Sequence, residues 1–306
     1  MHRPLTHWGL LVLLAMIWGV SFAFTSIAVK ELSPATLVFL RNLLACSLLF
    51  PLALLFRRQM PRGARVWAYI LTMSLIGNLI PFSLISWGQQ YIDSALAGIL
   101  MAVMPLVTIV LAHFFIQGET LTRAKLVGFS LGFIGILVLI GPQALQHLSF
   151  NSQALLGQFA VLTAAICYGC NTIIARRKPA SDPWSTSASI LAMGAMMTFP
   201  IASMTSGFGH AGTLYPGIPT FSTIGQLSES VLIAVAVLGL MCTGIATVIY
   251  MKLVYMAGPS FVSLINYMIP VWAVIVGIVF MGEQLQINHF VALALILVGV
   301  GVSQRT

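Results

Sequence analysis

Long stretches without a charged side chain constrain this chain more than any other feature. The longest runs from residue 126 to residue 175, and others cover residues 4–29, 66–92, 94–118 and 253–282. Hydrophobic residues make up 59% of the 306 residues and charged residues only 7%, and the mean hydropathy is +1.02. A helix that crosses a bilayer needs roughly 20 apolar residues. We therefore predict an all-α integral membrane protein.

The pattern predicts ten transmembrane helices. Their expected ranges are residues 8–28, 35–56, 67–87, 94–115, 125–141, 154–175, 185–204, 230–251, 259–281 and 286–303. With the N-terminus in the cytoplasm, twelve basic residues fall inside, only Lys30 falls outside, and Arg41 lies within the second span. This asymmetry follows the positive-inside rule. We therefore expect both termini in the cytoplasm, and the net charge of +8 does not require a nucleic-acid partner.

Blocks of the second half repeat blocks of the first. Residues 18–21 (Trp-Gly-Val-Ser) correspond to residues 168–171 (Tyr-Gly-Cys-Asn), and residues 94–105 correspond to residues 260–270. Each half then holds five spans, an odd number, so the second half must enter the membrane upside down relative to the first. We predict two inverted five-helix repeats, residues 1–142 and 143–306, around a central cavity.

The matched segments 94–105 and 260–270 both end in a proline, Pro105 and Pro270. A proline inside a helix frees the carbonyl four residues earlier, which here belongs to Met101 or Asn266. In hydrocarbon such a carbonyl needs a cavity, water or a ligand. Matched breaks in matched helices point to a transporter and its substrate site. We predict hinges at Pro105 and Pro270.

Helical spacing selects faces of the spans that carry aromatic, amide and hydroxyl groups, and such groups normally face the bundle interior or a wet cavity. The candidate substrate-binding residues are Trp18, Ser21, Asn78, Phe82, Met101, Tyr168, Asn171, Thr247, Tyr250, Asn266 and Tyr267. The alternative is packing or a hydrogen bond between helices. For any single serine or threonine, that alternative is the stronger one.

Arg41 is the one charged residue firmly within a predicted span. At the membrane centre an arginine costs roughly 2.5–3.5 kcal/mol. Snorkelling or a carbonyl partner would reduce that cost, and binding of a substrate carboxylate is a further alternative.

Aspartate and glutamate are absent from the bodies of the predicted spans. A buried carboxylate is the usual proton-coupling group, so coupling through an intramembrane acid is not expected. Glu119 and Glu283 are instead expected to cap the helices that follow them. The glycine-rich faces of spans 125–141 and 286–303 are typical of closely packed scaffold helices. The sequence indicates no cofactor and no metal cluster.

The chain resembles the drug/metabolite transporter superfamily, and within it the EamA-type permeases. The resemblance rests on the ten spans in two halves, on Trp18-Gly19-x-Ser21, on Arg41, and on the proline segments that run into Gly118-Glu119 and Gly282-Glu283. The general character is similar to that of bacterial amino-acid exporters of the YddG type. The resemblance implies a basket of helices around a central cavity, with substrate contacts at the matched aromatic and amide residues.

We therefore expect a secondary transporter of the bacterial inner membrane that exports amino acids, including aromatic and neutral ones, and related metabolites by alternating access. Within transport, the alternative is a broad drug-efflux or nucleobase and metabolite permease. From another class, the alternative is a membrane scaffold or enzyme without transport activity. The expected partners are a small-molecule substrate and membrane lipid, and the expected state is a monomer.

Overall fold

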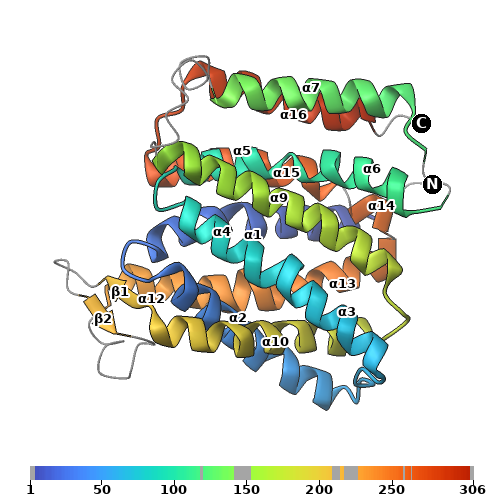
Figure 1. Ribbon diagram of the computed structural model, residues 1–306, viewed down its shortest axis with the longest axis vertical. Helices are drawn as coiled ribbons and strands as arrows, with labels where there is room; N and C mark the ends of the chain where they lie inside the picture. The colour runs from blue at the N-terminus through green and yellow to red at the C-terminus, as the bar shows by residue number, and fades with distance from the viewer. Residues whose placement is uncertain are drawn as a thin grey trace.

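The computed structural model describes residues 4–117, 120–140, 153–208, 214–216, 227–257, 259–262 and 264–303. Apart from one short hairpin, the elements described are helical. They are α1 (Leu5–Ala28), α2 (Pro34–Leu55), α3 (Ala64–Ser74), η1 (Leu75–Leu79), α4 (Ile80–Gly88), α5 (Ser94–Met101), α6 (Met104–Phe115), α7 (Arg123–Ile140), α9 (Gln153–Arg177), α10 (Pro183–Met204), α12 (Glu229–Ala236), η3 (Val237–Ile245), α13 (Ala246–Ala257), α14 (Pro259–Val262), α15 (Ile265–Met281) and α16 (Ile287–Ser303). The long helices lie side by side (Figure 1).

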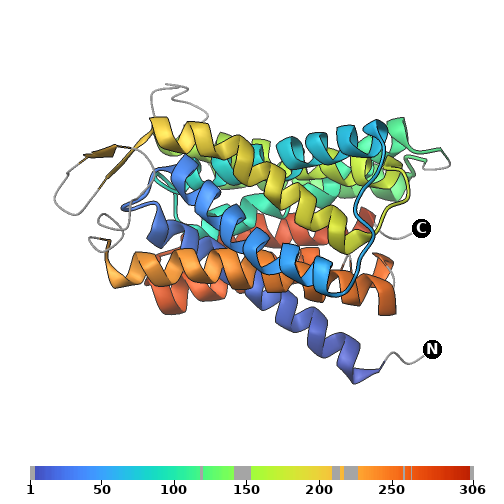
Figure 2. The same ribbon diagram turned by 90° about the horizontal axis from the view of Figure 1, so that it is seen from below.

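The prediction of an all-α membrane protein is confirmed. Seven helical runs among the described residues are long and apolar enough to cross a bilayer, and α15 and α16 are shorter apolar helices. Helix α1 begins and α16 ends at the same end of the bundle (Figure 1). The hairpin of β1 (Ser206–Phe208) and β2 (Leu214–Pro216), in which Ser206 pairs with Pro216, projects from the opposite end (Figure 2).

Two helical runs contain a π-helical turn. Segment η1 lies between α3 and α4 and ends two residues before Pro81, which has no N–H to donate and whose ring crowds the carbonyl of Gly77. Segment η3 lies between α12 and α13, where the hydroxyl of Thr243 donates to the carbonyl of Leu238 at 2.8 Å. Prolines and side chains inserted into the hydrogen-bond ladder are common causes of such distortions.

The two proline segments differ from one another in the structure. The helical run from Ser94 to Phe115 is interrupted at residues 102–103, and Pro105 follows in the first turn of α6. In the second segment, α14 ends at Val262, Leu264 lies in a turn directly before α15, and Pro270 sits inside the continuous helix α15. Both prolines are buried. The two hinges stay predictions.

Helices α7 and α16 pack against each other through glycine, as expected for scaffold helices. A β-carbon on Gly128 would lie 2.3 Å from the carbonyl oxygen of Gly299, and one on Gly299 would lie 2.5 Å from that of Gly128. Only glycine permits so close an approach of two backbones.

The Gly282-Glu283 pair ends α15 and reaches another helix. Gly282 adopts a left-handed conformation (φ 68°), and the N–H of Glu283 donates to the carbonyl of Gly277 at 3.0 Å, which closes the C-terminal end of α15. The Glu283 carboxylate then accepts hydrogen bonds from the start of α5. The prediction that Glu283 caps the following helix is therefore wrong, because the glycine turn directs its side chain toward α5. Glu119 lies outside the described residues.

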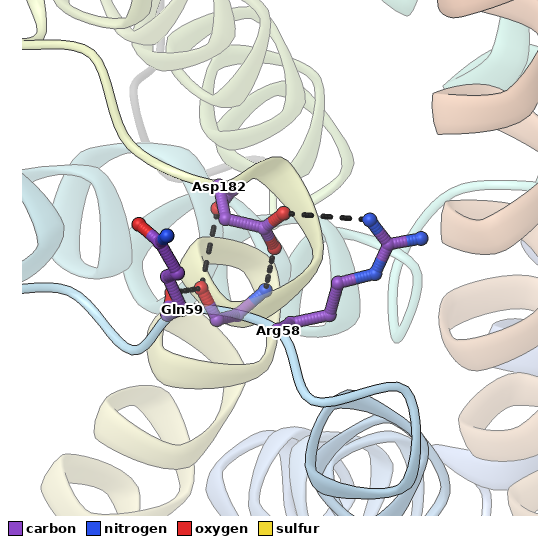
Figure 3. A network of polar contacts seen from close by, with 4 residues as sticks. Arg58, Gln59 and Asp182 are labelled. Carbon is purple, nitrogen blue, oxygen red and sulfur yellow. Dashed lines mark hydrogen bonds and ion pairs between the residues drawn. The ribbon is translucent and has the colours of Figure 1, made fainter.

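At the end of the bundle opposite the hairpin (Figure 1), the connection between α2 and α3 is tied to the start of α10 (Figure 3). Asp182 accepts from the backbone N–H of Ser185 at 3.0 Å and lies 3.8 Å from an Nη atom of Arg58. The hydroxyl of Ser185 donates to the carbonyl of Gln59 at 2.6 Å. These contacts join segments that are more than 100 residues apart in the chain.

Candidate functional site

Arg41, within α2, contacts a hydroxyl and an aromatic ring. Its Nε donates to the Thr243 hydroxyl at 2.7 Å, and its guanidinium carbon lies 3.9 Å from the centre of the Phe82 ring. A cation over an aromatic face gains about 0.5–2 kcal/mol. That gain offsets part of the cost of placing the charge inside the helix bundle. For Arg41 the sequence left open snorkelling, a carbonyl partner and a substrate carboxylate, and the partners that the structure shows are a hydroxyl and a ring.

Tyr168 extends this contact to α9. The rings of Phe82 and Tyr168 meet edge to face, with their centres 6.4 Å apart. We call Arg41, Phe82, Tyr168 and Thr243 the Arg41 cluster. Its members come from α2, α4, α9 and η3, so the cluster draws on both the first and the second part of the chain.

Trp18 and Tyr250 lie beside the Arg41 cluster. The indole Nε1 of Trp18 donates to the carbonyl of Cys242 at 3.1 Å, and the rings of Trp18 and Tyr250 are 5.7 Å apart. Cys242 precedes Thr243 in η3, so this contact connects α1 to the same helical turn that holds Arg41. Tyr250 keeps 40% of its surface exposed.

Of the three predicted asparagines, Asn78 lies in η1, and Asn171 of α9 lies against the η1 backbone at Gly77. A β-carbon on Gly77 would lie 2.3 Å from the side chain of Asn171, so glycine is what lets this amide approach the η1 backbone. The side-chain oxygens of Asn78 and Asn171 are buried and have no hydrogen-bond partner among the described residues. A buried polar atom without a partner costs about 1–3 kcal/mol, so each amide is a candidate for contact with a ligand.

Ser21 and Thr247 use their hydroxyls within their own helices. Ser21 donates to the carbonyl of Trp18, and Thr247 donates to that of Thr243, each at 2.6 Å. Such bonds are the usual state of serine and threonine inside a helix. In this conformation, the structure favours the packing alternative for these two residues.

The remaining predicted residues lie around α5 and α15. Met101 and Tyr267 are half-buried and pack against the same apolar core as Tyr168, a core that contains Leu100 and Leu106. Asn266 is half-buried in the first turn of α15. That all eleven candidates bind substrate stays a prediction.

A pocket of about 450 Å³ that the sequence does not indicate lies where α6 and α9 end. Residues 113–117, Thr120 and Arg177 line it, and none of the predicted site residues does. His113 stands alone in the sequence, and nothing in the local pattern indicates that Arg177 lies beside it. Among the described residues, no group of three or more histidine, cysteine, aspartate or glutamate side chains could hold a metal ion.

One carboxylate outside the helices has a shifted pKa. Burial and then the negative charge of Glu283 raise the pKa of Asp93, and the nearby His289 partly opposes this. Asp93 lies in the connection between α4 and α5, at the end of the bundle where Glu283 caps α5.

The sequence and the fold both have relatives. Residues 7–141 and 155–303 match the EamA-like transporter family. The "Uncharacterized transporter YoaV" of Bacillus subtilis is 24% identical over 298 residues, which cover 97% of this chain and 96% of that protein. The "Uncharacterized inner membrane transporter YedA" of Escherichia coli K12 is 26% identical over 297 residues, covering 95% of this chain and 88% of that protein. A protein of known crystal structure shares the fold with a TM-score of 0.65 and 19% identity, over 98% of this chain and 97% of that one.

Proposed function

The chain belongs to the EamA-like transporter family, and from this premise we propose that it is a secondary carrier that exports amino acids, including aromatic and neutral ones, and related metabolites. It moves them by alternating access, in which two half-bundles rock around a shared binding chamber. The observation that carries the proposal is the Arg41 cluster, a polar and aromatic group inside the bundle that is built from helices of both halves.

The two halves in this proposal are residues 1–142 and 143–306, each with five spans and inverted relative to the other. The two separate matches to the family support this division. The pattern of helix contacts supports it further. Helix α2 packs on α10, α5 on α15 and α7 on α16. The two helices of each pair hold the same position in their halves, so exchanging the halves leaves each pair the same.

The contacts of α1 and α9 follow the same exchange. Helix α1 packs against the run from α12 to α13 and against α15, and α9 packs against the run from α3 to α4 and against α5 and α6. The π-helical segments η1 and η3 also occupy equivalent runs, the third of each half. Two copies with equivalent contacts can exchange roles, and this exchange is the basis of alternating access.

In the proposed orientation, both termini are cytoplasmic and the protein lies as a monomer in a bacterial inner membrane. The basic residues of the connections α2–α3 and α9–α10 support the cytoplasmic placement of the termini, since these connections lie at the end where α1 begins and α16 ends (Figure 1). The name of the relative YedA, an inner membrane transporter, agrees with this location.

A zwitterionic substrate fits the side chains around the Arg41 cluster. The guanidinium supplies positive charge, the amides of Asn78 and Asn171 supply neutral polar groups, and Trp18, Phe82 and Tyr168 supply aromatic surface. A doubly charged phosphate would meet only one positive charge in this set.

Flux measurements test the proposal. The purified protein is reconstituted in proteoliposomes loaded with unlabelled phenylalanine, and uptake of labelled phenylalanine, leucine, uracil and ethidium is followed with and without a proton gradient. We expect exchange of the two amino acids above that of empty liposomes. Exchange of uracil or ethidium alone would favour a nucleobase or drug permease, and absence of flux for every solute would contradict a carrier.

A further inference from the structure

Arg41 has an incomplete set of partners. Its Nε is bonded to the Thr243 hydroxyl and its face is covered by the Phe82 ring. Within the described part of the chain, Nη1 and Nη2 have no hydrogen-bond partner, and Arg41 forms no ion pair with an acidic side chain there. The five acidic residues in that part, Glu31, Asp93, Asp182, Glu229 and Glu283, lie in connections or at helix ends.

A guanidinium in a membrane span normally pairs with an anion or with backbone carbonyls. Its five N–H groups form a planar fork. The bond to Thr243 uses the Nε edge, which leaves the edge formed by Nη1 and Nη2. That edge matches the two oxygens of one carboxylate in a bidentate arrangement. Thr243 and Phe82 fix the plane of the fork before any ligand arrives, which lowers the entropy lost on binding.

The side chains around Arg41 indicate the chemistry of the rest of the ligand. Tyr168 packs on Phe82, and Trp18 and Tyr250 lie beside the turn that holds Thr243. These rings offer apolar and aromatic surface next to the guanidinium. One cation compensates one negative charge, so a monocarboxylate suits the site better than a dicarboxylate or a phosphate.

We propose that Arg41 binds the carboxylate of the transported molecule through Nη1 and Nη2, so that the protein selects monocarboxylates with an apolar or aromatic body. This inference rests on the proposed function and adds the recognition element to it. Thr243 and Phe82 are positioning residues that act through Arg41.

Matched pairs of ligands test this site without relying on transport. Binding of phenylalanine and phenylalaninamide, and of 3-phenylpropionate and 3-phenylpropionamide, is measured by calorimetry on the purified full chain. The members of each pair differ only by the change from carboxylate to amide. We expect the intact protein to prefer each acid by at least about tenfold. Equal affinities within both pairs, or binding of none of the four compounds, would overturn the proposal, and neither result depends on a variant.

Variants then assign the preference to Arg41. In Arg41→Gln we expect the acid and the amide to bind within about threefold of each other, because the charge and the fork are both lost. Arg41→Lys keeps the charge and should retain only part of the preference. Thr243→Val should also reduce it, since the fork is no longer fixed. The matched control is Arg65→Gln, at the exposed start of α3, which should behave as the parent does. A full preference in both Arg41 variants would contradict the assignment.

Different results would refute the carrier function and the carboxylate site. If the acids bind in an Arg41-dependent manner but no amino acid crosses proteoliposomes, the carrier function is wrong and the carboxylate site stands. If amino acids and their amides are exchanged at equal rates and bind equally, the carrier stands and the carboxylate site is wrong.

Discussion

The carboxylate of Glu283 accepts a hydrogen bond from the backbone N–H of Ser94 at 2.8 Å, and it accepts a second from the Ser94 hydroxyl at 2.6 Å. Its other oxygen accepts from the N–H of Ala95 at 2.9 Å. A single side chain at the end of α15 thus satisfies two of the free N–H groups at the start of α5 and places negative charge at that helix N-terminus. The contact joins residues that are 189 positions apart.

We predict that Glu283→Ala destabilises the protein by about 1–3 kcal/mol, because the N–H groups of α5 lose a charged acceptor. Glu283→Gln should cost less, since it keeps an acceptor and loses only the charge. Thermal unfolding in detergent measures both. Glu229→Ala is the control, because Glu229 is exposed in the first turn of α12. Equal unfolding temperatures for the parent and Glu283→Ala would show that the cap contributes nothing to stability.

The glycine contact between α7 and α16 gives a second prediction. In Gly299→Ala, the new β-carbon would approach the Gly128 carbonyl and the Gly132 N–H, both backbone groups that cannot turn away. We expect a loss of about 1–3 kcal/mol from this overpacking. Gly301→Ala is a close control, because a β-carbon there meets nothing within 4 Å. Similar unfolding temperatures for the two variants would contradict the close approach of these helices.

Removing the predicted lining should weaken substrate affinity while the protein still folds. For Trp18→Ala and Asn266→Ala, we expect the KM for exchange of phenylalanine to rise at least about tenfold. Trp18→Phe should lie between Trp18→Ala and the parent, because it keeps a ring and loses the N–H that binds the Cys242 carbonyl. Trp67→Ala, a half-exposed residue of α3, serves as the control. An unchanged KM in Trp18→Ala and Asn266→Ala would count against the lining.

Proline replacement tests the hinges through the rate of turnover. In Pro105→Ala the backbone could form a regular helix across residues 102–103, so we expect initial exchange rates to fall by about tenfold or more, with a smaller change in KM. The effect of Pro270→Ala should be weaker, because α15 is continuous at that position. Pro51→Ala, at an exposed proline inside α2, should leave the rate unchanged. Parental rates in both Pro105→Ala and Pro270→Ala would remove the hinge assignment.

The positions of the helices could be predicted from the sequence, because the length of each apolar stretch and the local capping residues determine them. The span predicted at residues 94–115 corresponds to the run from Ser94 to Phe115, and the span predicted at 154–175 lies within α9. Ser33 and Asp182 accept from the N–H groups of Thr36 and Ser185 and mark two starts directly. These are local interactions, so a reading of neighbouring residues recovers them.

Contacts between segments that are far apart in the chain could not be predicted from the sequence in the same way. Glu283 caps α5 and not α16, because the left-handed Gly282 redirects the chain after α15. The π-helical turns depend on how the backbone hydrogen bonds of each helix rearrange around Pro81 and Thr243. The spacing of apolar residues in the sequence does not indicate this rearrangement. The sequence marked Arg41 as unusual, but its partners Thr243 and Phe82 come from other helices. Ser21 and Thr247 share a face with good candidates and nevertheless bond to their own helices.

The proposed mechanism depends on the inversion of the two halves, which cysteine accessibility at two equivalent positions measures. Lys30→Cys and Ala180→Cys, each exposed just after the first helix of its half, are made in a chain in which Cys46, Cys167, Cys170 and Cys242 are replaced by alanine. Intact spheroplasts are treated with a membrane-impermeant maleimide before and after permeabilisation. We predict labelling of position 30 from outside and of position 180 only after permeabilisation. Labelling of both positions from the same side would contradict the inverted repeat and, with it, the proposed mechanism.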